Sequence, residues 1–147
     1  MAGFFGTKAP VTSDIALVLE IAIIIILFVS RFRFARGKRY VTHGYTMAFA
    51  VGLHFVTILL VMIPAFINVF LPNLGGFSTF WIIIVLIHIP AGVIAWLIAL
   101  FLVVTWRFHS EKEMKCHRRR RLMRPLFWLW TFALVLGIVL YSAYFLV

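Results

Sequence analysis

The chain has 147 residues, of which 65% are hydrophobic, and it carries a formal net charge of +10. Its mean hydropathy of +1.11 excludes an ordinary soluble domain, in which about half of the residues are apolar. The excess falls into four apolar runs, each of about 20 residues or more and therefore long enough to span a bilayer. We predict a single integral membrane domain over residues 1–147.

The basic residues are concentrated in two segments. Thirteen of the fourteen Lys and Arg residues lie in Arg31–Arg39 or Arg107–Arg124, each between two apolar runs. This placement is typical of the positive-inside pattern and argues against a nucleic-acid partner. We expect both segments to face the cytoplasm and to attract anionic lipid headgroups. The residues assigned to this role are Arg31, Arg33, Arg36, Lys38, Arg39, Arg118, Arg119, Arg120 and Arg121.

The first span is predicted at about residues 14–31, after a lead-in that Gly and Pro break. Thr12, Ser13 or Asp14 is expected to cap it, because their side-chain oxygens accept hydrogen bonds from free helix amides. The N-terminus lacks the pattern of a signal peptide, in which a basic segment is followed directly by a short apolar run and an Ala-x-Ala cleavage site. We therefore expect this span to be retained rather than cleaved.

Glu20 interrupts the apolar first span. A charged side chain in a membrane costs about 2.5–3.5 kcal/mol at the centre on insertion scales and less near an end. Two alternatives remain open. The carboxylate reaches water at the outer end of the span, or it faces the bundle and pairs with a histidine.

The other spans are predicted at about residues 43–70, 80–106 and 122–145. An uncharged hairpin and a basic loop connect them, and connections this short predict an all-α, antiparallel up-down bundle of four transmembrane helices. The charge pattern predicts that both termini lie outside. We expect the membrane to be the plasma membrane of a prokaryote. Small residues in these spans, Gly52 with Ala48 and Gly92 with Ala95, indicate close approach between helices.

Counting about 1.5 Å per residue along each span places the histidines in depth. His43 and His117 fall at the inner surface, and His43 shares a helix face with Met47 and His54. His43 and His117 are the pair best matched in level. The alternative for each is a headgroup contact or a helix cap.

The same counting places Glu20, Met62 and His88 in the outer third of the bundle. His54 and His88 then differ in depth by roughly 9–12 Å, so one haem is not expected to bridge them, and His54 has no evident partner. As alternatives to ligation, His54 hydrogen-bonds a carbonyl or hydroxyl group. His88 satisfies a carbonyl that Pro90 leaves free in its own helix.

No catalytic motif is present, and the chain has four acidic residues and one cysteine. The sequence lacks HExxH, CxxC, Gly-x-Ser-x-Gly and P-loop patterns, so we expect no enzyme activity. Cys116 has no partner for an intrachain disulfide.

Several short motifs nonetheless form a recognisable series. They are His43-x-x-x-Met47, Met62-Ile-Pro-Ala-Phe66, Leu86-Ile-His-Ile-Pro-Ala-Gly92, and His117 followed by Arg124-Pro-Leu-Phe-Trp-Leu-Trp130 and Leu136-Gly-Ile-Val-Leu-Tyr141. The series resembles the four-helix membrane family labelled as domain of unknown function number 420. The best-known kind in that family is the CtaM-like protein needed for active cytochrome c oxidase in some bacteria.

The resemblance implies a haem- or copper-binding assembly or accessory factor that works with a larger respiratory membrane complex. It implies His43, His88 and His117 as ligands, with Met47 and Met62 as accompanying thioethers; imidazole suits haem iron or copper, and thioether suits Cu(I). An accessory subunit without any cofactor is the alternative. A proton or small-molecule carrier is disfavoured because the chain has no internal repeat.

Overall fold

The computed structural model describes residues 5–6, 9–107 and 119–145, which contain helices and turns but no strand. Four helices are long and apolar enough to cross a membrane: Val11–Ala35, Tyr40–Asn68, Thr79–Trp106 and Arg121–Phe145. This confirms the predicted all-α bundle of four spans.

Two of the four spans change their helix type along their length. In the first, α1 (Val11–Val29) continues as the π-helix η1 (Ser30–Ala35). The second consists of α2 (Tyr40–Thr57), the π-helix η2 (Ile58–Met62), α3 (Ile63–Ala65) and the π-helix η3 (Phe66–Phe70). After the short 3-10 turn η4 (Leu74–Gly76), the third and fourth spans are the single helices α4 (Thr79–Arg107) and α6 (Arg120–Phe145).

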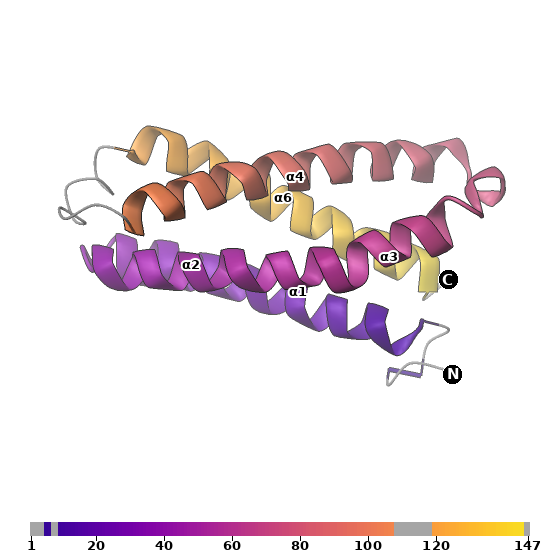
Figure 1. Cartoon of the computed structure of the whole chain (residues 1–147), viewed down its shortest axis with the longest axis horizontal. Helices are drawn as coiled ribbons and strands as arrows, with labels where there is room; N and C mark the ends of the chain where they lie inside the picture. Colours follow the sequence, from indigo (N-terminus) through magenta and orange to yellow (C-terminus); the bar gives the residue numbers. More distant parts are fainter. Residues whose placement is uncertain (1–4, 7–8, 108–118, 146–147) are drawn as a thin grey trace.

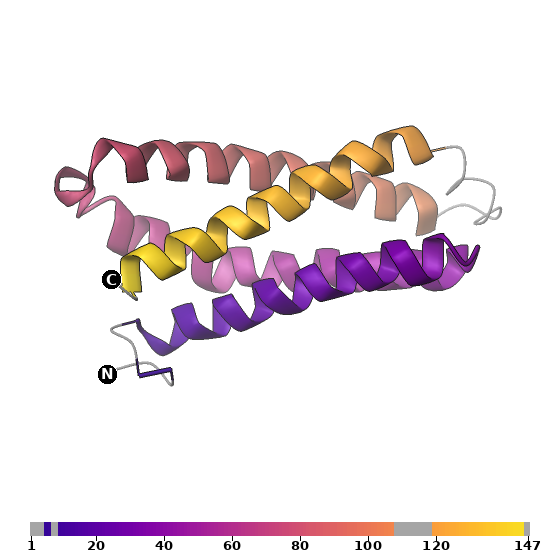
Figure 2. The same cartoon turned by 180° about the vertical axis from the view of Figure 1, so that it is seen from behind.

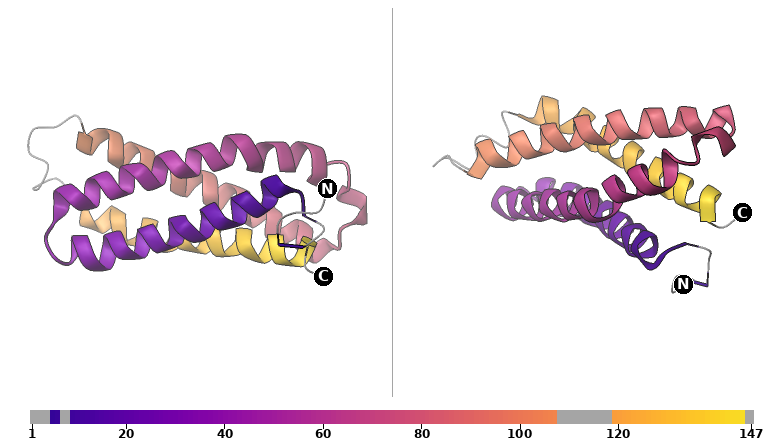
Figure 3. Two further views of the ribbon diagram at one scale, coloured as in Figure 1. Left: turned by 90° about the horizontal axis from the view of Figure 1, so that it is seen from below. Right: turned by 45° about the vertical axis from the view of Figure 1, so that its right-hand side comes forward.

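The spans form a ring in which α1 packs on α2, α2 on α4, α4 on α6, and α6 on α1. Each neighbouring pair is antiparallel, and the N-terminal end of α1 lies at the same end of the bundle as the C-terminal end of α6 (Figures 1 and 2). Helix α6 runs diagonally, from beside α4 at one end toward α1 at the other (Figure 3). It therefore contacts both halves of the bundle.

The start of α1 differs from the prediction. The helix begins at Val11, and its N-cap residue is Pro10, which makes no side-chain cap hydrogen bond. Asp14 is fully buried and accepts hydrogen bonds from the Phe5 amide at 3.3 Å and from the Tyr141 hydroxyl. The predicted cap at residues 12–14 is wrong, because the one carboxylate there is turned inward to tie α1 to the end of α6.

The π-helices lie at the ends and bends of the spans. Because η1 extends the first span to Ala35, Arg31 and Arg33 lie on a helix rather than in the predicted loop. Pro64, which has no amide hydrogen, lies in α3 between η2 and η3. Amides there bond carbonyls five residues earlier, as in Ile63 to Ile58 and Leu71 to Phe66. Each such turn holds more residues than an α turn.

The core lies between α1, α2, α4 and α6, and the outward faces are apolar. Ile23 and Trp130 have no exposed surface, whereas Leu60 is 68% exposed and Leu86 62%. Large exposed aliphatic side chains suit contact with lipid. Of the two glycines predicted to allow close approach between helices, Gly52 and Gly92, only Gly92 lies against a neighbouring helix. A Cβ at Gly92 would lie 4.0 Å from the Cβ of Ala133, but nothing lies within 4 Å of a Cβ at Gly52, so close packing there is wrong.

Gly44 and Gly52 on α2 form a matched test of this packing. A Cβ at Gly44 would lie 2.2 Å from the buried ring of Trp106. We expect Gly44→Ala to lower the free energy of unfolding by about 1–3 kcal/mol through overpacking. Gly52→Ala is expected to raise it by up to about 1 kcal/mol, because alanine favours the helix and meets no neighbour there. Unfolding in detergent, followed by circular dichroism, measures both; equal effects would contradict this packing.

Candidate functional site

Two cavities of the described bundle, one toward each end, are lined by candidate residues. The hairpin-end cavity has a volume of about 640 Å³, and its wall combines α1, the second span, α4 and α6. Its polar lining includes Glu20, His54 and His88, and most of the remaining wall is aliphatic or aromatic. The basic-end cavity has a volume of about 480 Å³ and is lined by basic side chains on one side and core residues on the other.

Glu20 is only 6% exposed and lines the hairpin-end cavity, so its carboxyl group faces the bundle. A Cβ at position 137 would lie 2.7 Å from its Oε2 atom, and Gly137 therefore provides the space that the carboxyl group occupies. Within the described part of the chain, Glu20 has no hydrogen-bond or ion-pair partner. Of the two alternatives for Glu20, the structure shows the inward orientation, but the pairing with a histidine that went with it is not observed.

His54 is buried and has a partner, contrary to prediction. The indole nitrogen of Trp130 donates to its Nδ1 at 3.1 Å, and the two rings meet edge to face at 5.6 Å. An indole nitrogen only donates, so Nδ1 accepts, and the neutral imidazole carries its proton on Nε2. In this state Nε2 of His54 is a hydrogen-bond donor and not a metal ligand.

His88 has the opposite arrangement. Its Nδ1 lies 2.9 Å from the carbonyl oxygen of Ala133, to which it donates, and the neutral ring therefore keeps a free lone pair on Nε2. Metal-binding histidines are commonly oriented by such a bond to a carbonyl. The carbonyl comes from α6 and not, as the alternative prediction had it, from the helix of His88 itself.

His54 and His88 therefore contact α6 at Trp130 and Ala133, three residues apart and within one turn. Both line the hairpin-end cavity, so His54 shares a cavity with the predicted outer set, while the predicted difference in depth between the two histidines stays a prediction. The depth count assumed regular α-helices, but the π-helices η2 and η3 lie between His54 and the hairpin. A constant rise per residue overstates that distance.

The predicted ligands are divided between the cavities. His88 and Met62 line the hairpin-end cavity together with Glu20, which confirms that these three gather there, whereas His43 and Met47 line the other. Among the described residues, no group of three or more His, Cys, Asp or Glu side chains is placed to hold a metal ion. The ligand roles stay predictions.

His43 lies at the basic end as predicted. Its Nδ1 is 2.7 Å from the Oγ atom of Ser30 and 3.2 Å from the Ser30 carbonyl oxygen, which joins the second span to η1. The predicted partner His117, like Arg118, falls outside the described residues. The pairing of His43 with His117 therefore stays a prediction.

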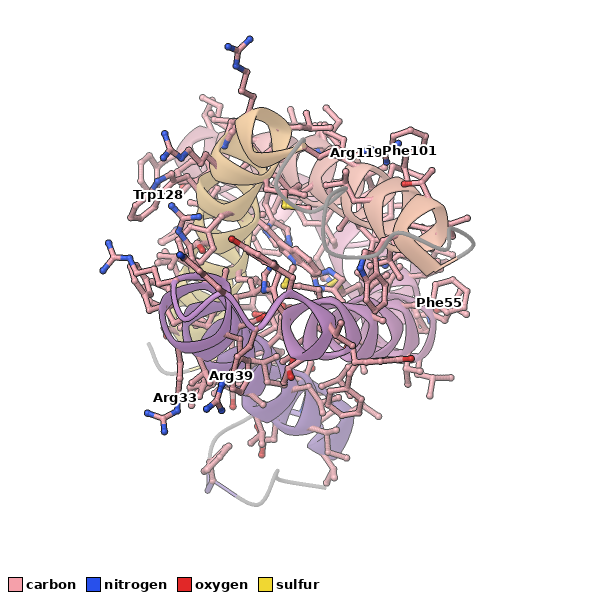
Figure 4. The ribbon with its side chains drawn as sticks, turned by 90° about the vertical axis from the view of Figure 1, so that its left-hand side faces the viewer. Arg33, Arg39, Phe55, Phe101, Arg119 and Trp128 are labelled. Carbon is pink, nitrogen blue, oxygen red and sulfur yellow. The ribbon has the colours of Figure 1, made fainter. Side chains whose placement is uncertain are left out.

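The basic residues of this end have different environments. Arg31, Arg36 and Lys38 line the basic-end cavity together with Arg124. Arg33 and Arg39 do not line it; they are exposed and point away from the bundle (Figure 4). The remaining described members are Arg119, whose guanidinium group donates to the Thr105 hydroxyl and lies 5.2 Å from the Phe101 ring centroid, Arg120 in α6, and the exposed Arg121.

The sequence prediction missed the α6 residues that organise the hairpin-end cavity, Trp130, Ala133 and Gly137. One pattern indicated them: their spacing of three and four residues puts them on one helix face. A tryptophan in the middle of a span, rather than at an interface, was a second indication.

No family model, no curated protein and no solved structure matches the chain. The family resemblance therefore stays a prediction, and the functional argument rests on the geometry of the two cavities.

Two carboxyl groups of α1 give a paired prediction. Glu20→Gln is expected to raise the free energy of unfolding by about 1 kcal/mol or more, because a buried, unpartnered carboxyl group must either keep its charge or take up a proton at a cost, whereas an amide is neutral throughout. Asp14→Asn is expected to lower it by about 1 kcal/mol or more, because the amide cannot accept from both Phe5 and Tyr141. Denaturant unfolding in mixed micelles measures both. A loss of stability in Glu20→Gln would show that the carboxylate has a structural partner.

The His54–Trp130 hydrogen bond can be measured by a double-mutant cycle. His54→Leu leaves a buried indole donor unsatisfied, Trp130→Phe removes that donor, and the double variant removes both. We expect a coupling free energy of about 0.6–1.7 kcal/mol, the range seen for hydrogen bonds between membrane helices. Strictly additive effects on unfolding would argue against this bond.

Proposed function

We propose that the chain is a small haem-binding accessory or assembly protein of a membrane-bound respiratory oxidase, and that haem occupies the hairpin-end cavity. The observation that carries the proposal is the orientation of His88. Its Nδ1 is bonded to the carbonyl of Ala133, which leaves Nε2 as a free donor atom in the wall of a large apolar cavity. The connection to an oxidase rests on the motif series and its resemblance.

The donor set fits haem better than copper. Haem iron is held by one or two axial ligands, whereas a copper site needs several side chains that converge. The cavity offers the imidazole of His88 and the thioether of Met62, and no cluster of three ionisable ligands occurs in the described chain. Its volume of about 640 Å³ lies within the range of about 300–1,000 Å³ typical of cofactor sites.

Three polar residues of the cavity, His88, His54 and Glu20, have separate tasks in this proposal. His88 provides the coordinating nitrogen, and the bond to Ala133 fixes its ring. His54 presents an Nε2–H donor, because Trp130 occupies its Nδ1. Glu20 is a buried acceptor beside Gly137. When bound, haem would supply electron transfer or be passed on to the oxidase.

The proposed topology follows the charge pattern. Both basic segments face the cytoplasm, both termini lie outside, and anionic headgroups surround the inner ends of the helices. Exposed apolar side chains, such as Phe49 and Phe80 at 62% each, provide faces for lipid or for a larger respiratory complex.

A cofactor-free structural subunit is the second candidate. One observation favours it: each described histidine already has a hydrogen-bond partner within the protein, His43 with Ser30, His54 with Trp130 and His88 with Ala133. These bonds satisfy one nitrogen of each ring without any ligand.

The visible spectrum of the pure protein tests the first proposal. We expect haemin added to the protein in mild detergent to give a Soret band that His88→Ala abolishes. His43→Ala, which changes a histidine of the other cavity, should leave the band unchanged. A folded protein without a Soret band, or a band that survives His88→Ala, would overturn the proposal. Unchanged assembly of a respiratory complex in His88→Ala would then favour the structural subunit.

A further inference from the structure

We propose that the basic-end cavity is a specific site for one anionic phospholipid, whose phosphate is held by Arg36 and Arg124 and whose acyl chain lies along the apolar wall. This site is independent of the haem proposal, because it occupies the other cavity. It differs from the general attraction between basic loops and lipid headgroups, because it requires particular side chains.

The charge on this cavity comes from parts of the chain that are distant in sequence. Arg31, Arg36 and Lys38 line it from η1 and the following turn, and Arg124 lines it from α6. The acidic residues within the described chain, Asp14 and Glu20, contact the opposite half of α6, at Tyr141 and Gly137. The cavity thus gathers four basic side chains apart from Asp14 and Glu20, and a phosphate would match the positive charges of Arg36 and Arg124.

Two guanidinium groups are held in place by aromatic rings. The central carbon of Arg31 lies 4.9 Å from the ring centroid of Phe127, and that of Arg36 lies 4.8 Å from the ring centroid of Phe32. A guanidinium group over a ring is attracted by its negative face. A planar guanidinium group binds a phosphate through parallel hydrogen bonds, and positioning it before binding reduces the entropy cost.

The inner wall of the cavity selects a lipid over a free phosphate ion. Leu27, Met47 and Leu102 line the cavity beneath the basic side chains, with Phe127 and Trp130 beside them. A phosphate ion would leave this wall without a partner, whereas an acyl chain buries it. Basic cavities between transmembrane helices are known to bind the headgroups of anionic lipids.

The same end of the bundle provides a matched control. Arg33 and Arg39 are exposed, as Arg36 and Arg124 are, but they point outward in Figure 4 and do not line the cavity. Arg36→Gln/Arg124→Gln and Arg33→Gln/Arg39→Gln each remove two positive charges from this end. If diffuse charge alone attracts the lipid, lipid binding weakens equally in both double variants. If the lipid occupies a specific site, its binding weakens only in Arg36→Gln/Arg124→Gln.

The experiment titrates the purified full chain, in a neutral detergent, with dioleoylphosphatidylglycerol and with dioleoylphosphatidylcholine, and native mass spectrometry counts the bound lipid. We expect one phosphatidylglycerol molecule per chain and at least about tenfold weaker binding of phosphatidylcholine. Arg36→Gln/Arg124→Gln should weaken phosphatidylglycerol binding by about tenfold for each guanidinium group removed. Arg33→Gln/Arg39→Gln should change it by less than about threefold.

Two more arms distinguish a lipid site from a site for free phosphate and from an effect of charge alone. Inorganic phosphate should not displace the lipid, since it cannot use the apolar wall; displacement at millimolar phosphate would overturn the lipid assignment. Arg36→Lys/Arg124→Lys retains the charge without the planar fork and should show an intermediate loss. Equal losses in the two glutamine variants, with circular dichroism showing both folded, would overturn the proposed site.

Discussion

The inward face of α6 is the constraint on which the rest of the bundle depends. Trp130 donates to His54, Ala133 accepts from His88, and Gly137 leaves space for Glu20. Each of the other three spans thus places one polar side chain against the same face of one helix. In the hydrocarbon region no water replaces a missing hydrogen bond, so these contacts fix how the spans are rotated about their axes.

Trp130 also separates the two cavities. Its side chain lines the basic-end cavity, while its bonding partner His54 lines the hairpin-end cavity. The two cavities have opposite chemistry. One contains a buried carboxyl group and two imidazoles in an apolar wall, and the other combines basic side chains with an apolar wall. The described part of this small bundle therefore holds two separate cavities of different character.

The sequence predicted which residues line the candidate site better than it predicted which residues those side chains contact. Counting along the spans brought Glu20, Met62 and His88 together, and they do line one cavity. It left His54 apart from them, although His54 lines the same cavity, because the count followed depth along each span and not the contacts that side chains make across to α6. It also missed the role of α6, because a tryptophan or a glycine in an apolar run becomes informative only once the residue facing it is known.

The sequence by itself determined the architecture. The length and hydropathy of the four runs required spanning helices, and the short connections required antiparallel neighbours. Only the tertiary structure decided which faces of those helices meet, and hence that Asp14 bonds Tyr141 rather than capping α1. The physical reason is that hydropathy fixes which residues leave water, whereas packing between side chains far apart in the sequence fixes which neighbour each polar group meets. The contacts that His54, His88 and Glu20 make with α6 are therefore set by packing and not by hydropathy.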